Sequence, residues 1–252
     1  MIVTRKQLRK LIINEIKVDG FDFHKTLEKK IWADESTMDP EVLENLLAIV
    51  ENFIDGLPIQ VSAYDVRLTG SIANYNWSKY SDIDLHIQTE FSEIDEDEEL
   101  VRSYFNSVTA LWNLKHAIMI GGYEVEIYVE NAGEEHVSSG VYSLTDAEWL
   151  VMPVKEQSHE IDVSAVRKKA GNIANQISEL DRIKDPKEAL ELSDRIKEKI
   201  RRMRKSGLQT KKAQYSTGNI AFKVLRRSGD LEKLSMIKNR AHDELFSINE
   251  SD

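Results

Sequence analysis

Two aspartates separated by one apolar residue form the pattern in this chain that most directly suggests chemistry. In the run D-I-D-L-H-I, residues 82–87, polar and apolar side chains alternate, as they do in a half-buried strand. Asp82 and Asp84 therefore share one face of that strand. Two close carboxylates disfavour each other's charged form unless a cation lies between them. Mg²⁺ or Mn²⁺ accepts such carboxylates together with water and phosphate oxygens, so the pair predicts a divalent cation site that substrate phosphates would complete.

A glycine-serine pair precedes the aspartates. Residues 65–69 alternate in the same way and predict a short strand, which Gly70 and Ser71 follow directly. Glycine permits close approach of the backbone to a ligand, and a serine at the start of a helical turn leaves N–H groups that can receive phosphates. Residues 72–81 are long enough for such a turn and a return to the strand. An ordinary turn and cap is the alternative interpretation.

Three other polar residues lie close to the aspartates in the sequence. Lys79 and Ser81 are candidate nucleotide-binding residues, although exposed loop residues would look the same. His86 falls on the strand face that carries the aspartates, and we interpret it as a polar surface residue rather than a ligand.

A third acidic side chain is expected from a neighbouring strand. The run Y-E-V-E-I-Y-V-E, residues 123–130, places three valine and isoleucine side chains on one face and three glutamates with a tyrosine on the other. Like charges facing each other across strands are destabilising, which makes a bound cation their natural counterpart. Glu126, with its central apolar flanks, is favoured as the third carboxylate over Glu124.

The order of these features resembles the DNA polymerase beta-like nucleotidyltransferase superfamily. The likeness covers about residues 60–155: glycine-serine, ten residues, D-I-D on a strand, then a later acid on an apolar strand. The resemblance implies two metal-binding carboxylates, a third that helps bind the ion activating the attacking hydroxyl, and a glycine-serine pair that holds the triphosphate. These implied roles fall on Asp82, Asp84, Glu126, Gly70 and Ser71. The third position is often aspartate in that superfamily and is glutamate here.

A closer likeness covers most of the chain. The runs Y-N-W-S-K-Y-S-D-I-D-L-H-I and S-S-G-V-Y-S-L resemble nucleotidyltransferase-like proteins of large tailed phages. The sequence has no cysteine, and its longest apolar runs are far shorter than the roughly 20 residues that cross a bilayer. We therefore expect a protein that has no membrane partner and is cytoplasmic, in the host cytoplasm if a phage encodes it.

The sequence divides into three expected regions. Residues 1–36 are predicted as an N-terminal helical segment, 37–157 as the nucleotidyltransferase catalytic domain, and 158–252 as a basic helical domain. A helix is expected from Asp39-Pro40 to about residue 55, because proline suits the first helical position. The expected fold class is α+β, with a mixed sheet of about five strands in the catalytic core, N-terminal helices and a C-terminal helical domain.

Charge is distributed unevenly along the chain. Residues 195–240 contain 15 Lys and Arg against 3 Asp and Glu, whereas residues 1–194 contain 19 against 37. Such a basic region can hold a polyanion, including RNA. Solvated faces of amphipathic helices are the equal alternative, since no aromatic stacking platform is evident beside the basic residues.

Together these patterns predict a metal-dependent nucleotidyltransferase. It would move a nucleoside monophosphate from a nucleoside triphosphate such as ATP to an acceptor hydroxyl and release pyrophosphate, with two Mg²⁺ ions stabilising both oxygens. RNA, for example a tRNA-like end, is the favoured acceptor, and a protein or a small molecule is the alternative. The alternatives are an inactive nucleotide- or RNA-binding module of the same fold, and an oligonucleotide second-messenger synthase.

Overall fold

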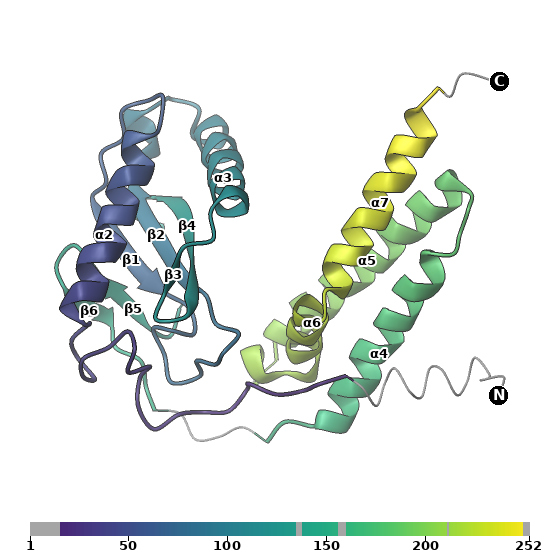
Figure 1. The fold of residues 1–252 in the computed structure, drawn as a ribbon, viewed down its shortest axis with the longest axis horizontal. Coiled ribbons are helices and arrows are strands. Elements are labelled where there is room, and N and C mark those ends of the chain that lie inside the picture. The colour runs from purple at the N-terminus through teal and green to yellow at the C-terminus, as the bar shows by residue number, and fades with distance from the viewer. Residues whose placement is uncertain (1–15, 135–137, 156–159, 211, 249–252) are drawn as a thin grey trace. The chain divides into compact units, whose positions relative to one another are not determined.

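The computed structural model describes residues 16–134, 138–155, 160–210 and 212–248 (Figure 1). Its contacts divide the chain into two compact units. One unit is Gly20–Ser158, and the other combines Met1–Asp19 with His159–Asp252. The first contains a mixed β-sheet with helices and the second contains helices, so the expected α+β class is confirmed.

The described residues of the sheet unit form a six-stranded sheet in the order β3-β4-β2-β1-β5-β6. Only the pairing of β2 with β4 is parallel, and the other four pairings are antiparallel. The expected mixed sheet is therefore present, with a short extra strand at one edge. The strands are β1 (Asp65–Thr69), β2 (Ile83–Thr89), β3 (Met119–Ile120), β4 (Tyr123–Asn131), β5 (Val141–Ser143) and β6 (Glu148–Val151).

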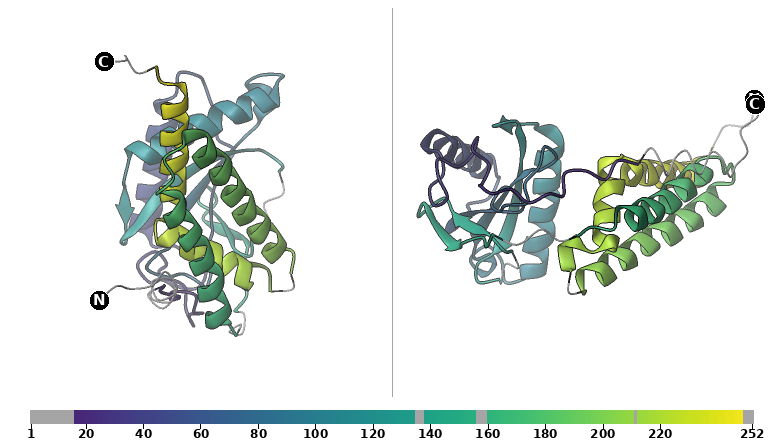
Figure 2. Two further views of the ribbon diagram at one scale, coloured as in Figure 1. Left: turned by 90° about the vertical axis from the view of Figure 1, so that its right-hand side faces the viewer. Right: turned by 90° about the horizontal axis from the view of Figure 1, so that it is seen from below.

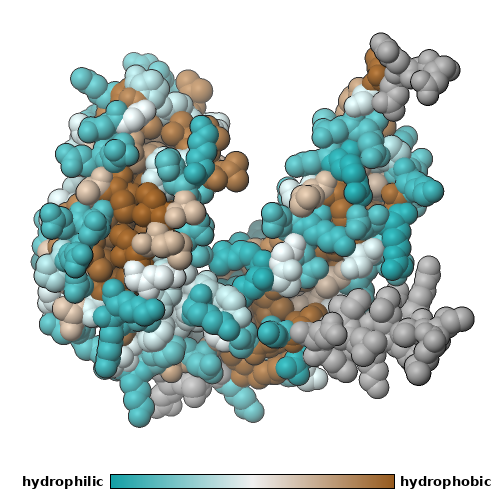
Figure 3. Space-filling model, viewed as in Figure 1, coloured by the Kyte–Doolittle hydropathy of each residue, from teal (hydrophilic) through white to brown (hydrophobic). Residues whose placement is uncertain are grey.

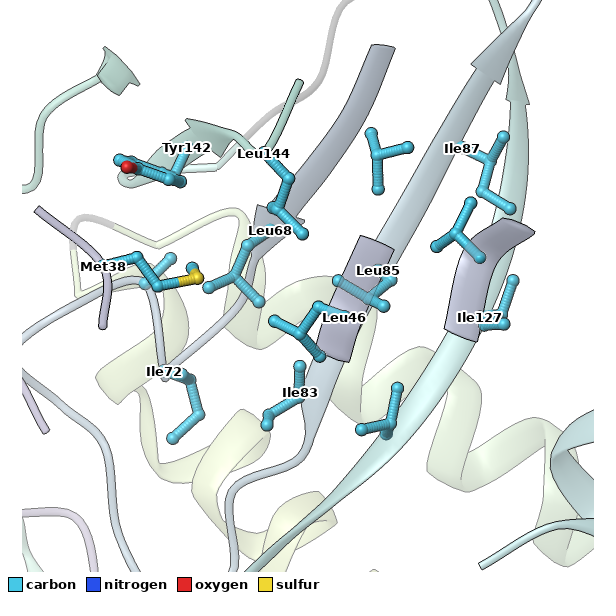
Figure 4. Close-up of a cluster of buried hydrophobic side chains, with 14 of the residues drawn as sticks. Met38, Leu46, Leu68, Ile72, Ile83, Leu85, Ile87, Ile127, Tyr142 and Leu144 are labelled. Carbon is cyan, nitrogen blue, oxygen red and sulfur yellow. The ribbon is translucent and has the colours of Figure 1, made fainter. Parts of the chain in front are cut away.

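Helices α2 (Pro40–Asp55) and α3 (Glu98–Lys115) supply apolar side chains to the core on the sheet's apolar face, and a short 3-10 helix, η1 (Phe91–Glu93), follows β2. Helix α2 begins as predicted: the Asp39 carboxylate caps the first turn and Pro40 occupies its start. Figure 4 shows Leu46 of α2 among Leu68, Ile83 and Ile127 of the strands. The alternation in β2 and β4 is explained by this core, because every second side chain packs into it.

Residues 20–36 belong to the sheet unit, and no helix occurs in residues 16–36. The predicted N-terminal helical segment is therefore wrong for these residues, and residues 1–15 lie outside the described part. The reason is that Leu27, Ile31 and Trp32, each at most 2% exposed, pack into the sheet's core from an irregular backbone. Burial at these positions outweighs local helix propensity.

In its described residues, the second unit consists of helices α4 to α7, drawn in green to yellow in Figure 2. Aspartates cap α4 and α5, Pro186 occupies the start of α5, and Ser216 caps α6. The side chains of Lys233 and Arg240 in α7 both pair with Asp181, just after α4. The helices are α4 (Val163–Leu180), α5 (Pro186–Leu208), α6 (Thr217–Arg227) and α7 (Asp230–Phe246), with a 3-10 helix, η2 (Ala213–Tyr215), before α6.

Among the described residues, no helix combines the length and apolar character that a membrane span requires. Hydrophilic side chains cover much of the face of both units that Figure 3 displays.

Candidate functional site

The polar face of the sheet carries three rows of side chains that cross β1, β2 and β4. Strand register sets these rows, because directly opposed residues on paired strands project to the same face. The register places Asp84 beside Glu126 of the parallel neighbour and beside Thr69 of the antiparallel one. The three rows are Thr69-Asp84-Glu126, Arg67-His86-Tyr128 and Asp65-Gln88-Glu130.

The structure brings together two of the three predicted carboxylates as strand neighbours. Asp84 and Glu126 lie in one row and are both partly exposed. Asp82 lies immediately before β2, at the same end of the sheet. Glu124 is paired with Met119 of β3 and is not opposite Asp84. The register therefore places Glu126, rather than Glu124, next to Asp84.

Gly70 forms a tight contact with the Asp84 carboxylate. Its φ of +76° lies in the left-handed region, which glycine adopts without steric cost. A Cβ added at Gly70 would overlap Asp84 Oδ2 and approach Asp84 Cγ to 3.3 Å. The glycine is therefore required for two reasons: its backbone conformation and the space that the carboxylate fills.

The connection from Gly70 to β2 contains turns and no helix. The Asn74 N–H donates to the Ser71 carbonyl at 3.2 Å, which closes a single turn. A second turn is closed before β2, where the Ser81 N–H donates to the Ser78 carbonyl at 2.9 Å. Neither turn continues into a helix, so residues 70–82 do not provide the multiple free N–H groups of a helix N-terminus. Buried aromatic and apolar residues shape the connection instead, and Ile72, Ala73 and Tyr75 are each at most 2% exposed.

Ser71 and Ser81 contact each other across this connection. Their hydroxyl oxygens are 2.7 Å apart, and Ser81 Oγ also accepts a hydrogen bond from the Ser78 N–H at 2.9 Å. Ser81 is buried, so its hydroxyl serves the loop itself. Lys79 is exposed, and its Nζ lies 4.7 Å from the centroid of the Tyr80 ring. The structure thus assigns a loop-closing contact to the predicted Ser81 and a surface position to Lys79.

Two distant segments hold the Gly70-to-β2 connection in place. The Trp32 indole N–H donates to the Ile72 carbonyl at 2.9 Å, and the Trp77 indole N–H donates to the Thr26 carbonyl at 3.0 Å. From the other side, Gly140 approaches so closely that a Cβ there would overlap the Ala73 carbonyl oxygen. Sequence reasoning missed these supports. The aromatic residues within 20–36 were the available signal, because they predict burial rather than a solvated segment.

Glu126 is held by a chain of polar contacts along the same face. The Tyr128 hydroxyl donates to Glu126 Oε2, and the Tyr128 ring stacks on His86 with centroids 5.1 Å apart. His86 Nδ1 lies 2.6 Å from Glu130 Oε1, and the Gln88 amide donates to Glu130 Oε2 at 2.9 Å. These contacts orient one oxygen of Glu126 and leave the other for a ligand.

The acidic side chains of this face shift the pKa of the Tyr128 hydroxyl. Burial, the hydrogen bond to Glu126 and the charges of Glu126, Asp84 and Asp82 all raise the pKa of the Tyr128 hydroxyl. The hydroxyl therefore stays protonated and acts as a donor at neutral pH. All three predicted carboxylates act on one side chain, so they share a negative local field.

A cation accompanies the acids on the same face. Arg67 Nε lies 2.7 Å from Asp65 Oδ2, and the Ser143 hydroxyl donates to Asp65 Oδ1 at 2.7 Å. Arg67 is opposite His86 in the register. Its guanidinium, anchored through one nitrogen, can offer further N–H donors to a phosphate. The alternation of residues 65–69 is consistent with the position of Arg67 on this face, but it gives no sign of the pairing with Asp65.

The candidate ligand atoms are carboxylate oxygens at one end of the β2–β4 pair, and carboxylate oxygens are ligands that Mg²⁺ and Mn²⁺ prefer. Within the described ranges, no group of three or more His, Asp or Glu side chains converges closely enough to hold a metal ion. One or two carboxylates suffice for Mg²⁺ when water and phosphates complete its coordination. Asp84 and Glu126, with Asp82 beside them, therefore fit an ion that arrives with a phosphate-bearing substrate.

Neither protein-family models nor curated proteins give a match to this sequence. Chemically, the face combines neighbouring carboxylates, a glycine packed against one of them, and an anchored guanidinium. Such a set can bind a divalent cation and the phosphates that accompany it.

Proposed function

We propose that the chain is a metal-dependent nucleotidyltransferase that moves a nucleoside monophosphate from a nucleoside triphosphate to an acceptor hydroxyl, with release of pyrophosphate. The observation that carries the proposal is the packing of Gly70 against Asp84, which lies beside Glu126 on the neighbouring parallel strand. A glycine turn adjoining strand carboxylates is the arrangement that the superfamily resemblance implies.

Each residue of the site has a role in this proposal. Asp84 and Glu126, with Asp82, would hold Mg²⁺ or Mn²⁺, which when bound neutralises phosphate charge and acidifies an attacking hydroxyl. Gly70 adopts the left-handed turn without steric cost and leaves the room that the Asp84 carboxylate occupies. Tyr128 keeps the Glu126 carboxylate oriented through its hydroxyl. RNA is the acceptor that we propose for the transferred nucleotide.

A labelling experiment tests this function. Purified protein is incubated with each α-labelled nucleoside triphosphate, with Mg²⁺ or Mn²⁺, and with total RNA, cell protein or no acceptor. We expect the label in RNA for the wild type and for Glu148→Gln, whose side chain is exposed on β6. Asp84→Asn should lose the transfer and keep the same thermal unfolding midpoint to within a few degrees. Full transfer by Asp84→Asn would contradict the proposal, and label in a short oligonucleotide without acceptor would indicate a second-messenger synthase.

A second candidate function is a nucleotide-binding module without chemistry. The observation in its favour is that the carboxylates of the described residues do not converge as a group of three. Equilibrium dialysis with labelled ATP distinguishes the two functions. Nucleotide binding that requires Asp84, with no label transferred to any acceptor, would replace the enzyme by the binding module.

A further inference from the structure

Helices α5 and α6 present a group of cations that the proposed active site does not use. Lys223, Arg226 and Arg227 are spaced i, i+3 and i+4 on α6, so their side chains leave the helix on one side. Arg204 of α5 joins them from the neighbouring helix: its guanidinium carbon lies 4.3 Å from the centroid of the Phe222 ring. A guanidinium stacked on a partly exposed aromatic ring therefore borders the Lys223 ammonium.

The two helices are fixed tightly against each other. A Cβ added at Gly218 of α6 would lie 2.7 Å from the Met203 carbonyl oxygen of α5. A Cβ at Gly207 of α5 would lie 2.5 Å from the Ser216 hydroxyl oxygen. The backbones approach this closely only because both positions are glycine. The position of Arg204 relative to Lys223 is thus set by a rigid helix pair rather than by flexible loops.

Lys223 is the most constrained cation of the group. Burial, together with the positive charges of Arg227, Arg226 and Arg204, lowers the pKa of the Lys223 ammonium to about 8. Every charge acting on this ammonium is positive. By contrast, the Lys238 ammonium of α7 lies 2.5 Å from Asp194 Oδ1. A mostly buried lysine surrounded by like charges costs stability, and a bound anion would relieve that cost.

The residue types indicate which anion fits. Phosphates suit the ammonium and guanidinium groups, and a base can stack on the guanidinium plane of Arg204. Phe222 supplies the aromatic group that the sequence pattern did not reveal. An acidic peptide would use the charges but not the stacked pair of Arg204 and Phe222.

We propose that Arg204, Phe222, Lys223 and Arg226, here called the α5–α6 cluster, bind a single-stranded nucleic acid through its phosphates and one base. That this strand is the acceptor of nucleotide transfer rests on the proposed function, whereas the binding itself does not. RNA and DNA share the chemistry that the cluster recognises, so both belong in the test.

The test measures binding by fluorescence anisotropy at several salt concentrations, with labelled RNA and DNA strands about 12 nucleotides long and no nucleoside triphosphate. We expect log K to fall linearly with log salt for the wild type. Lys223→Gln and Arg204→Gln should each reduce that slope by about 0.7, the value for one lost single-strand phosphate contact. Lys187→Gln, an exposed lysine at the start of α5, is the matched control and should leave the slope unchanged.

Proton linkage provides a second readout. Affinity of the wild type should fall as the pH rises above about 8, because deprotonated Lys223 no longer attracts phosphate. Lys223→Gln should lose this pH dependence, an effect that a purely structural role would not produce. Arg204 is exposed, so its variant keeps the test informative if Lys223→Gln fails to fold.

Two results would overturn the proposal. The first is that Lys223→Gln and Arg204→Gln both bind the strands with the affinity and salt slope of the wild type. The second is that polyglutamate of the same total charge displaces the labelled strand as well as an unlabelled strand does. Tighter binding of RNA than DNA would support an RNA acceptor, and equal binding would still support the cluster. Asp84→Asn should bind the strands like the wild type, so loss of nucleotide transfer with strand binding retained in this variant tests the active site. Loss of strand binding in Lys223→Gln or Arg204→Gln tests the α5–α6 cluster.

Discussion

Replacing Gly70 by alanine should disable the site while leaving the fold intact. The change has two separable costs. An L-residue in the left-handed region costs roughly 1–2 kcal/mol, and Gly70 has a φ of +76°. The new Cβ would also overlap Asp84 Oδ2, so the carboxylate must move by about 1 Å to restore ordinary van der Waals contact.

The chain provides a control for the backbone cost. Gly229, which precedes α7, has a φ of +77°, and an added Cβ there would meet no atom within 4 Å. Gly229→Ala therefore carries the same conformational strain without touching the carboxylates. Gly229→Ala should lose about 1–2 kcal/mol of unfolding free energy, the cost of the left-handed conformation, and Gly70→Ala should lose at least as much because the overlap with Asp84 adds to that cost.

Activity should separate the two variants. A misplacement of about 1 Å in a reacting group can cost about 100-fold, so we expect kcat/KM of Gly70→Ala to fall by about that factor. Gly229→Ala should retain wild-type kcat/KM. Initial rates of label transfer and urea unfolding measure the two effects. The reasoning would be refuted by near wild-type activity in Gly70→Ala, or by an equal loss of activity in both variants.

Three further perturbations follow from the structure. Tyr128→Phe keeps the ring but removes the donor to Glu126, so kcat should fall about 10-fold with an unchanged KM for nucleotide, as initial rates will show; an unchanged kcat would argue against the positioning role. Lys223→Met removes a buried charge whose pKa is 10.5 unfolded and about 8 folded, so below pH 8 urea unfolding should show the variant to be more stable by on the order of 3 kcal/mol. Between pH 8 and pH 10.5 the unfolded wild type binds more protons than the folded wild type, so the folding stability of the wild type rises with pH. The difference in unfolding free energy between variant and wild type should therefore vanish near pH 10.5. A difference that does not change with pH would contradict the lowered pKa of Lys223. Asp39→Ala removes the cap of α2 and should lower stability by about 1 kcal/mol in the same assay, whereas no change would show that the cap is dispensable.

Local patterns were sufficient to place much of the framework. The period-two alternation predicted the strands at residues 65–69 and 123–130, and β1 and β4 agree with it to within one residue. Asp39 and Pro40 predicted the start of α2. These features are readable because alternation and helix caps depend on residues a few positions apart. The same alternation placed Asp84 and Glu126 on polar strand faces.

Non-local packing decided the rest of the site. Nothing in residues 82–87 or 123–130 states that Asp84 lies opposite Glu126 in a parallel pair; hydrogen bonding between β2 and β4 sets that register. Likewise, the predicted N-terminal helical segment extended to residue 36, whereas burial of Trp32 against the sheet accompanies an irregular path in its described part.

The distinction has a single physical origin. The face on which a side chain lies follows from backbone geometry within its own strand or helix, so Asp82 and Asp84 could be grouped before any fold was known. The neighbours of that face depend on contacts between segments far apart in the chain. Only the folded chain therefore placed Gly70 on Asp84, brought Trp32 to the loop that begins there, and set Arg204 on Phe222 beside Lys223.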